Sequence, residues 1–240
     1  MFTYSELKEK PKEFLAATGL KVEEFEILLP AFETAYEKIY PPNLNAEGKE
    51  RQRRAGGGNK SVLATTAEKL VFILVYEKTN PLQTMHGLQF GLSQPQTNYW
   101  IHRLLPVLKE ALGELKLMPE REATKVVERM KGQATPASGV VDATKRRRNR
   151  PVDATKQQAH YSGKKKAHTD KNIVLVDEYT GHIIYLGETL PGKIHDKKAI
   201  DEQPPVFPVN ATLGQDTGFQ GYAPSGVIVE QPKKNRKERC

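Results

Sequence analysis

Apolar residues recur at helical spacing through the first part of the chain. Residues 1–42 begin with the capping-box pair Thr3 and Glu6, carry a helix stop at Gly19 and end with the helix-breaking pair Pro41-Pro42. Between these signals, apolar side chains recur every three or four residues: Val22, Phe25, Leu28, Leu29, Phe32, Tyr36 and Ile39. Such spacing places the apolar side chains on one helix face. We therefore predict a block of packed N-terminal helices.

A second helical block, residues 61–118, carries a tighter pattern. A short helix over residues 81–90, a turn at Gly91-Leu92 and a longer helix capped by Ser93 have the spacing of a helix-turn-helix. The polar residues on the outward side of the second helix are of types that hydrogen-bond base edges or phosphates in a major groove: Gln96, Asn98, Tyr99, His102 and Arg103. The same geometry occurs in plain helical bundles, so a purely structural interpretation stays open.

Two segments interrupt the helical pattern. Residues 43–60 are polar and basic and contain three consecutive glycines, which indicates a flexible linker. The arginines at 51, 53 and 54 could form an arm along DNA, or they could only solubilise the tether. Residues 119–137 lose the helical periodicity to Pro, Gly, Thr and charge. We predict a second linker there, between two domains.

Beyond residue 137 the pattern changes to short apolar runs typical of strands. The predicted strands are Val140-Val141, residues 172–177 and 182–188, which form a hairpin around Gly181, and residues 211–216 and 226–230. A short helix is expected at residues 195–201. The predicted fold class is α+β in two domains: an all-α helix-turn-helix domain, then a mixed-sheet domain over residues 138–230 with a basic tail at 231–240.

Positive charge is concentrated in one part of the chain. The net charge is +8, and residues 145–171 contain ten Lys or Arg against only Asp153 and Asp170. Such an excess suits a polyanionic partner, and we expect Lys164, Lys165 and Lys166 to hold phosphates. A solvated loop is the alternative, because charge runs often lie on plain surface.

Composition excludes other classes of protein. No apolar run approaches the roughly 18 residues of a membrane-spanning helix, and the N-terminus does not begin a signal peptide. We therefore expect no membrane partner and a cytoplasmic location. The one cysteine, Cys240, excludes an internal disulfide and a cysteine metal site.

Two aspartates are candidate metal ligands. Asp142 follows Val140-Val141, and Asp216 ends the run at residues 211–216; small or turn residues follow each. A carboxylate at a strand end is accessible to divalent ions. Two carboxylates can begin a magnesium site, but two-metal phosphodiester chemistry usually needs more oxygen ligands.

The order of the motifs resembles the DDE-superfamily transposases of bacterial insertion sequences, in the group with an N-terminal helix-turn-helix. The matching segments are Val141–Thr144, Arg150-Pro151, His160–Thr169, Pro191–Asp196 and Asp216–Gly221. The resemblance covers nearly the whole chain. It implies a ribonuclease-H-like domain that cuts and joins double-stranded DNA at element terminal repeats with Mg²⁺ or Mn²⁺, in a bacterial cytoplasm and associated with the nucleoid.

The resemblance also assigns roles by position. Asp142 resembles the first catalytic and metal-binding aspartate, and Asp216 the second. His195 and Asp196 resemble a motif near the site, where His195 contacts a phosphate or water; Asp196 as a helix cap is the simpler alternative.

The third acid of the family has no match here. It lies on a helix after the strand that corresponds to residues 226–230, and neither Glu230 nor Glu238 fits that position. We therefore expect the ribonuclease-H-like domain to be incomplete, the chain to be truncated, frameshifted or half of a split frame, and the chain to be inactive alone. A homo-oligomer or a complementing C-terminal polypeptide is an expected partner.

Two rival functions remain open at this stage. A non-catalytic DNA-binding remnant would regulate a full-length transposase by occupying the same DNA ends or by forming mixed oligomers. A metal-independent RNA-binding protein rests only on basic charge and aromatic residues.

Overall fold

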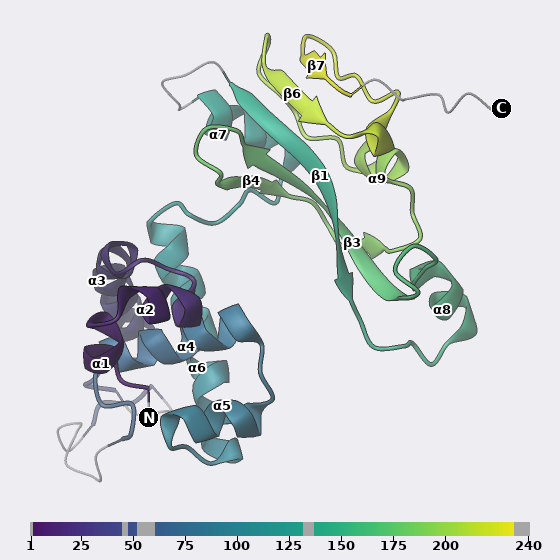
Figure 1. Ribbon diagram of the computed structural model, residues 1–240. Helices are drawn as coiled ribbons and strands as arrows, with labels where there is room; N and C mark the ends of the chain where they lie inside the picture. Colours follow the sequence, from purple (N-terminus) through teal and green to yellow (C-terminus); the bar gives the residue numbers. More distant parts are fainter. Residues whose placement is uncertain (1, 45–47, 52–60, 132–136, 233–240) are drawn as a thin grey trace. The chain divides into compact units, whose positions relative to one another are not determined.

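The computed structural model describes residues 2–44, 48–51, 61–131 and 137–232 (Figure 1). It divides into two compact units, Met1–Met118 and Pro119–Cys240. The described elements of the first unit are helices, and the second unit contains a curled mixed sheet with helices. The predicted α+β fold class is confirmed. Across the described ranges, no helix combines the length and the apolar character needed to cross a membrane.

Local signals delimit the helices of the first unit. These helices are α1 (Tyr4–Lys8), α2 (Pro11–Thr18), α3 (Val22–Ile39), α4 (Thr66–Thr79), α5 (Gln83–Phe90) and α6 (Gln94–Glu114). Thr3 caps α1 by accepting from the Glu6 N–H, Gly19 ends α2 at φ +78°, and Thr65 opens α4 with a capping box. The predicted positions of these helices are therefore confirmed.

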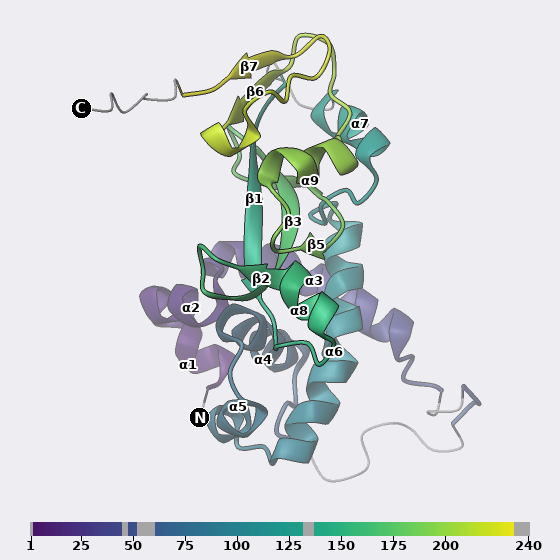
Figure 2. The ribbon, with the colours of Figure 1, turned by 90° about the vertical axis from the view of Figure 1, so that its right-hand side faces the viewer.

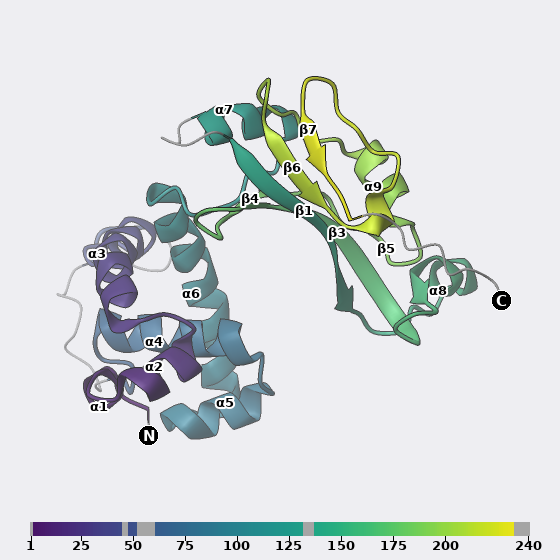
Figure 3. The ribbon, with the colours of Figure 1, turned by 45° about the horizontal axis from the view of Figure 1, so that its top comes forward.

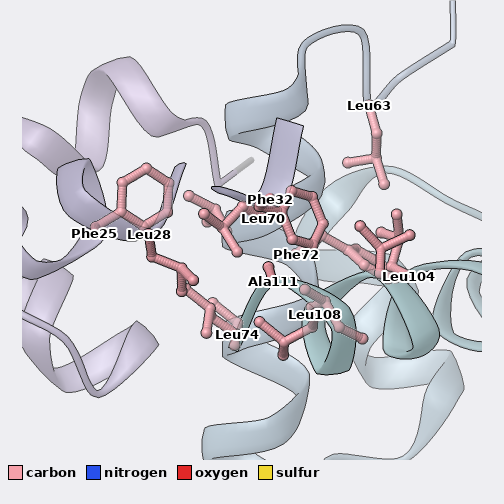
Figure 4. Close-up of a cluster of buried hydrophobic side chains, with 14 of the residues drawn as sticks. Phe25, Leu28, Phe32, Leu63, Leu70, Phe72, Leu74, Leu104, Leu108 and Ala111 are labelled. Atoms are coloured by element: carbon pink, nitrogen blue, oxygen red, sulfur yellow. The ribbon is translucent and has the colours of Figure 1, made fainter. Parts of the chain in front are cut away.

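Helix α4 lies at the centre of the first unit. Every residue from Lys69 to Val75 is buried, so this helix has no solvent face over two turns. Figure 4 shows Leu70, Phe72 and Leu74 of α4 among side chains from α3 and α6, including Phe32 and Leu104. This shared core holds the helix-turn-helix against the N-terminal helices.

The turn between α5 and α6 depends on two glycines. Gly91 ends α5 in the left-handed region at φ +66°. A Cβ at Gly87 would lie 2.5 Å from the Leu92 carbonyl oxygen and 2.6 Å from Thr97 Oγ1. Because there is no room for that atom, Gly87 allows α5 and α6 to approach closely.

The second unit is built on one mixed sheet with strand order β2-β3-β1-β6-β7, and with β4 and β5 also paired to β3. Its strands are β1 (Ser138–Arg147), β2 (Tyr161–Ser162), β3 (Ala167–Asp177), β4 (Ile183–Leu186), β5 (Leu190–Pro191), β6 (Thr212–Gln215) and β7 (Ile228–Glu230). β1 is antiparallel to β3 and parallel to β6, which is parallel to β7. The predicted hairpin is formed by β3 and β4.

Helices of the second unit are short. They are η1 (Ala123–Lys125), α7 (Val126–Lys131), α8 (Ala154–His160), α9 (Asp196–Glu202) and η2 (Thr217–Phe219). Side chains of α7 and α9 share one core with the buried sheet residues Val141, Ile173 and Leu213. Figure 2 shows α9 lying beside β1 and β3. Alternate residues of β1 face the other way and are exposed, which leaves one face of this strand open to solvent.

The structure corrects the prediction that residues 119–137 form a linker. Val126 and Met130 of α7 are buried in the core of the second unit, and Glu120 exchanges backbone hydrogen bonds with Ile184 and Leu186. Helix α7 has only six residues, so its sequence contains a single apolar pair at i,i+4. One pair is too short a repeat to indicate a helix, and the segment therefore resembles a loop in the sequence. Parts of the predicted linkers and tail lie outside the described residues, including Arg53, Arg54 and Glu238.

Candidate active site and DNA-binding helix

Asp142 and Asp216 occupy matching positions on two neighbouring parallel strands. The last register pair of β1 and β6 joins Val141 to Gln215, and the two aspartates are the next residues. The backbone of Asp216 is still extended, at φ −81° and ψ 177°, before the chain turns into η2. The carboxyl ends of parallel strands are common ligand sites in sheets, and Asp216 lies at such an end. Asp142 does not: β1 continues to Arg147 in its pairing with β3, so the expectation that Asp142 ends a strand is wrong.

Both aspartates are exposed. Asp142 belongs to the exposed face of β1, with Val140 and Thr144, and not to the face that packs against α9. Asp216 lines a shallow hollow of about 540 Å³ together with Val140, Gly214 and Glu230. An ion in solvent can therefore reach both carboxylates.

Each carboxylate also accepts a backbone hydrogen bond. Asp142 Oδ1 accepts from the Ala143 N–H at 2.7 Å, and Asp216 Oδ1 accepts from the Gly218 N–H at 2.8 Å as the cap of η2. These contacts restrain the orientation of the two carboxylates. The donor set fits Mg²⁺ or Mn²⁺, since both are ions that carboxylate oxygens bind well.

A third acid, Glu230, lies on β7, the strand next to β6. It ends β7 and is in register with Gly214 of β6. It lines the same hollow as Asp216. Within the parts of the chain that the structure describes, however, no group of three or more His, Cys, Asp or Glu side chains could hold a metal ion.

His195, and not Asp196, caps α9. His195 Nδ1 accepts from the Lys197 N–H at 3.4 Å, so the alternative in which Asp196 is the cap is wrong. Asp196 instead accepts from Lys171 Nζ at 2.5 Å, and the Lys171 side chain is only 1% exposed. The same ammonium donates to the Ile194 carbonyl. Sequence reasoning missed Lys171, because a lysine within a basic stretch gives no sign that it is buried.

Gly218 brings Asp196 close to the candidate site. A Cβ on Gly218 would lie 2.8 Å from Asp196 Oδ2 and 2.9 Å from Asp216 Oδ1. The carboxylates of Asp196 and Asp216 therefore both lie next to Gly218. Any larger residue at this position would displace one of them. Lys171 compensates the charge of Asp196 in this arrangement.

Several lysines lie near Lys145 of β1. Partial burial lowers the pKa of Lys145, and the positive charge of Lys171 lowers it further, while Asp196 opposes the shift. Lys164 and Lys165 also lower the pKa of Lys145, so these cations lie near one another. Lys164, Lys165 and Lys166 are exposed between β2 and β3. The cluster can attract a phosphate group.

Residues at the start of α6 divide into two groups. Gln96 accepts from the Ser93 N–H and hydroxyl, and Asn98 donates to Gln83, so both are engaged locally. The Arg103 guanidinium lies 3.5 Å from the ring centroid of Tyr40 and is half-buried. Tyr99 and His102 are exposed. Gln96 is exposed as well, so three of the five predicted DNA-binding side chains, Gln96, Tyr99 and His102, lie on the surface, and Asn98 and Arg103 are partly buried.

Comparisons with known families match both parts of the chain. Residues 61–114, which contain α4, α5 and α6, match the family model described as the helix-turn-helix of DDE superfamily endonuclease. Residues 141–239, which contain Asp142 and Asp216, match the model described as DDE superfamily endonuclease. Searches of curated proteins and of solved structures found no match. The two family models, in this order along the chain, identify it as a member of the DDE-superfamily transposases, with an N-terminal helix-turn-helix region and an endonuclease domain.

Proposed function

We propose that this protein binds the ends of an insertion element and contributes a metal-dependent centre for DNA cleavage and strand transfer. The observation that carries the proposal is the adjacent placement of Asp142 and Asp216 at the ends of the parallel β1–β6 pairing. Both residues lie within the segment that matches the endonuclease family.

In this proposal, Asp142 and Asp216 hold Mg²⁺ or Mn²⁺ through carboxylate oxygens. Bound divalent ions would activate a water or 3′-hydroxyl nucleophile and stabilise the leaving oxygen in phosphodiester chemistry. The backbone N–H groups of Ala143 and Gly218 orient the two carboxylates. Lys164 and Lys165 hold the DNA phosphates that must approach these two acids.

The helix-turn-helix supplies recognition of the element end. Tyr99 and His102 are exposed on α6 and can reach base edges or phosphates. Gln96 and Arg103 act indirectly, by capping α6 and by packing on Tyr40. Binding should weaken steeply with salt, because phosphate contacts release counterions.

A second candidate function is non-catalytic DNA binding that regulates a complete transposase. It is favoured by the pairing of Asp196 with buried Lys171, which leaves this nearby acid charge-compensated. The family resemblance implies three acids, and here Asp142 and Asp216 are the two brought into matching strand positions. In this case the chain occupies the same DNA ends as its complete relative or forms mixed oligomers with it.

The test uses the full chain with a labelled duplex that carries the element terminal repeat, with Mn²⁺. The chain alone should bind this duplex without cleaving it, because Asp142 and Asp216 lack the third acid of the family. Cleavage that is lost in Asp142→Ala and Asp216→Ala and retained in Asp201→Ala, an exposed acid paired with Lys197, would show that another acid, such as Glu230, completes the site. Binding without cleavage by any variant would select the regulatory function. Failure to prefer the terminal repeat over random duplex would overturn both.

A further inference from the structure

A second cavity lies in the endonuclease domain, beside α8. It has a volume of about 710 Å³, and its lining includes Arg150, Gln157, Tyr161, His168 and Lys193. We call it the α8 pocket. Figure 3 shows α8 beside the end of β3 that is remote from α7. Neither Asp142 nor Asp216 lines it.

The α8 pocket lies some distance along β3 from the candidate metal site at Asp142 and Asp216. Asp142 is paired with Val174, and His168 lies six residues earlier on the same strand. Six residues of β-strand span roughly 20 Å. A DNA strand could therefore contact both places while following the basic β2–β3 turn.

The aromatic wall of the pocket is held by the sheet. Tyr161 of β2 is in register with His168 of β3, and their rings meet edge to face with centroids 5.5 Å apart. Tyr161 is nevertheless 45% exposed. An aromatic ring held rigidly at a cavity and open to solvent is a platform on which a planar group can stack.

Hydrogen bonds to α8 also hold the two basic residues that line the pocket, Arg150 and Lys193. Arg150 Nε donates to Gln157 Oε1 of α8 at 2.9 Å. The Lys193 N–H donates to the Ala159 carbonyl, and the Gly192 N–H donates to the Thr169 carbonyl. A Cβ at Gly192 would lie 1.9 Å from Thr169 Oγ1, so this loop is pressed against β3. Lys193 is thereby kept at the rim of the α8 pocket.

The acids of this basic stretch are engaged elsewhere. Asp153 caps α8 by accepting from the Lys156 N–H, and Asp170 accepts from Arg148 at 2.9 Å and lies 2.9 Å from His160. Neither acid lines the pocket. The pocket therefore combines an exposed aromatic ring, two cations and the amide of Gln157, without a carboxylate among its described lining residues.

We propose that the α8 pocket binds an unpaired nucleotide of a DNA strand, with the base against Tyr161 and the phosphate between Arg150 and Lys193. The inference rests on the proposed DNA-binding function and specifies the form of DNA. A base in a duplex is already covered on both faces by its neighbours, so it cannot stack on Tyr161. The volume lies within the roughly 300–1,000 Å³ typical of ligand pockets.

The test compares two duplexes of the same sequence, one blunt and one with a three-nucleotide single-stranded overhang that carries 2-aminopurine. Binding to the full chain is measured without divalent metal, so that no cleavage intervenes. The overhang should bind more tightly by about 5- to 100-fold, and 2-aminopurine fluorescence should be quenched on stacking. A duplex whose overhang is abasic should bind like the blunt duplex, a control that needs no protein variant.

Variants locate the effect. Tyr161→Ala should remove both the preference and the quenching, whereas Tyr161→Phe, which keeps the ring, should retain them. Tyr179→Ala removes another exposed tyrosine, 61% exposed, and should change neither. For overhang binding, the logarithm of the binding constant should fall linearly with the logarithm of the salt concentration. Arg150→Ala and Lys193→Ala should each reduce the magnitude of this slope by about one.

Several outcomes would overturn the proposal. Equal binding of the overhang and blunt duplexes, or an overhang preference that survives in Tyr161→Ala, would remove the nucleotide site while leaving the proposed DNA function intact. Failure of the chain to bind either duplex would instead overturn the proposed function. Tighter binding of a ribonucleotide overhang, or competition by free deoxynucleotide at micromolar concentration, would show that the pocket serves RNA or a free nucleotide.

Discussion

Lys171, buried on β3, donates to the carboxylate of Asp196, the first residue of α9, at 2.5 Å. The contact joins residues 25 positions apart and ties the start of α9 to the sheet. Because Asp196 and Asp216 both lie beside Gly218, this ion pair also determines which charges surround the candidate metal site.

The first prediction concerns the stability of this pair. Asp196→Asn should lower the free energy of unfolding by about 3–5 kcal/mol, because it leaves the Lys171 ammonium buried without a compensating charge. The double variant Lys171→Met/Asp196→Asn should lose less free energy of unfolding than the sum of the losses in the two single variants. Urea unfolding of the four proteins measures this coupling. Lys197→Met, which breaks an exposed pair, is the control and should change stability little; fully additive costs would contradict the coupling.

The second prediction concerns metal capture. Asp142→Asn and Asp216→Asn should each weaken Mn²⁺ binding by about tenfold or more, since each removes a charged oxygen ligand. Mn²⁺ binding to the full chain can be followed by the electron paramagnetic resonance signal of the free ion. Asp201→Asn should leave it unchanged. Wild-type affinity in both candidate-site variants would show that the ion binds elsewhere.

The third prediction separates recognition from helix stability on α6. His102→Ala and Tyr99→Ala should weaken binding to the terminal repeat and leave the melting temperature nearly unchanged, because both side chains are exposed. Gln96→Ala should instead lower stability by about 1 kcal/mol, since it removes half of a capping box. Fluorescence anisotropy and thermal unfolding distinguish the two effects. A loss of DNA binding only in Gln96→Ala would reverse the assignment.

The fourth prediction is a pH dependence in the first unit. His86 is fully buried against Phe72 and Phe90, and this burial lowers its pKa from 6.5, although contacts with Gln89 and Phe72 oppose the shift. As the pH falls below about 6.5, His86 binds a proton in the unfolded chain more readily than in the folded chain. The contribution of neutral His86 to the free energy of unfolding is therefore full above about pH 6.5 and is lost as the pH decreases.

Denaturation at pH 7.5 and pH 5.5 tests this dependence. His86→Phe should flatten the pH profile, whereas His102→Ala, which removes an exposed histidine, should not. An unchanged profile in His86→Phe would assign the effect to other groups.

The fifth prediction concerns the close approach of α5 and α6. Gly87→Ala should destabilise the first unit by about 1–3 kcal/mol and weaken DNA binding, because the added Cβ would lie 2.5 Å from the Leu92 carbonyl oxygen. Gly113→Ala is the matched control: nothing lies within 4 Å of its Cβ position, and alanine favours helix. It should stabilise α6 slightly. Similar melting temperatures for the two variants would contradict the steric argument.

Sequence reasoning located the features that depend on neighbours within one helical turn or one strand. Thr3, Gly19 and Ser93 mark helix ends because capping bonds join residues about three apart. The β3–β4 hairpin and the strand that precedes Asp216 follow from short apolar runs with turn residues beside them, whereas β1 continues past Asp142 through a basic stretch that gives no strand signal. The order of motifs was enough to predict the transposase family, which the family models confirm.

The tertiary structure decided which distant residues meet. Strand order and register place Asp142 of β1 and Asp216, the residue after β6, at corresponding positions, bury Lys171 beside Asp196 and leave Asp142 on the exposed face. The same packing places α7 in the core, although its sequence resembles a loop. Local chain preferences carry no information on such contacts, because their free energy comes from burial and charge pairing that exist only once the sheet has formed.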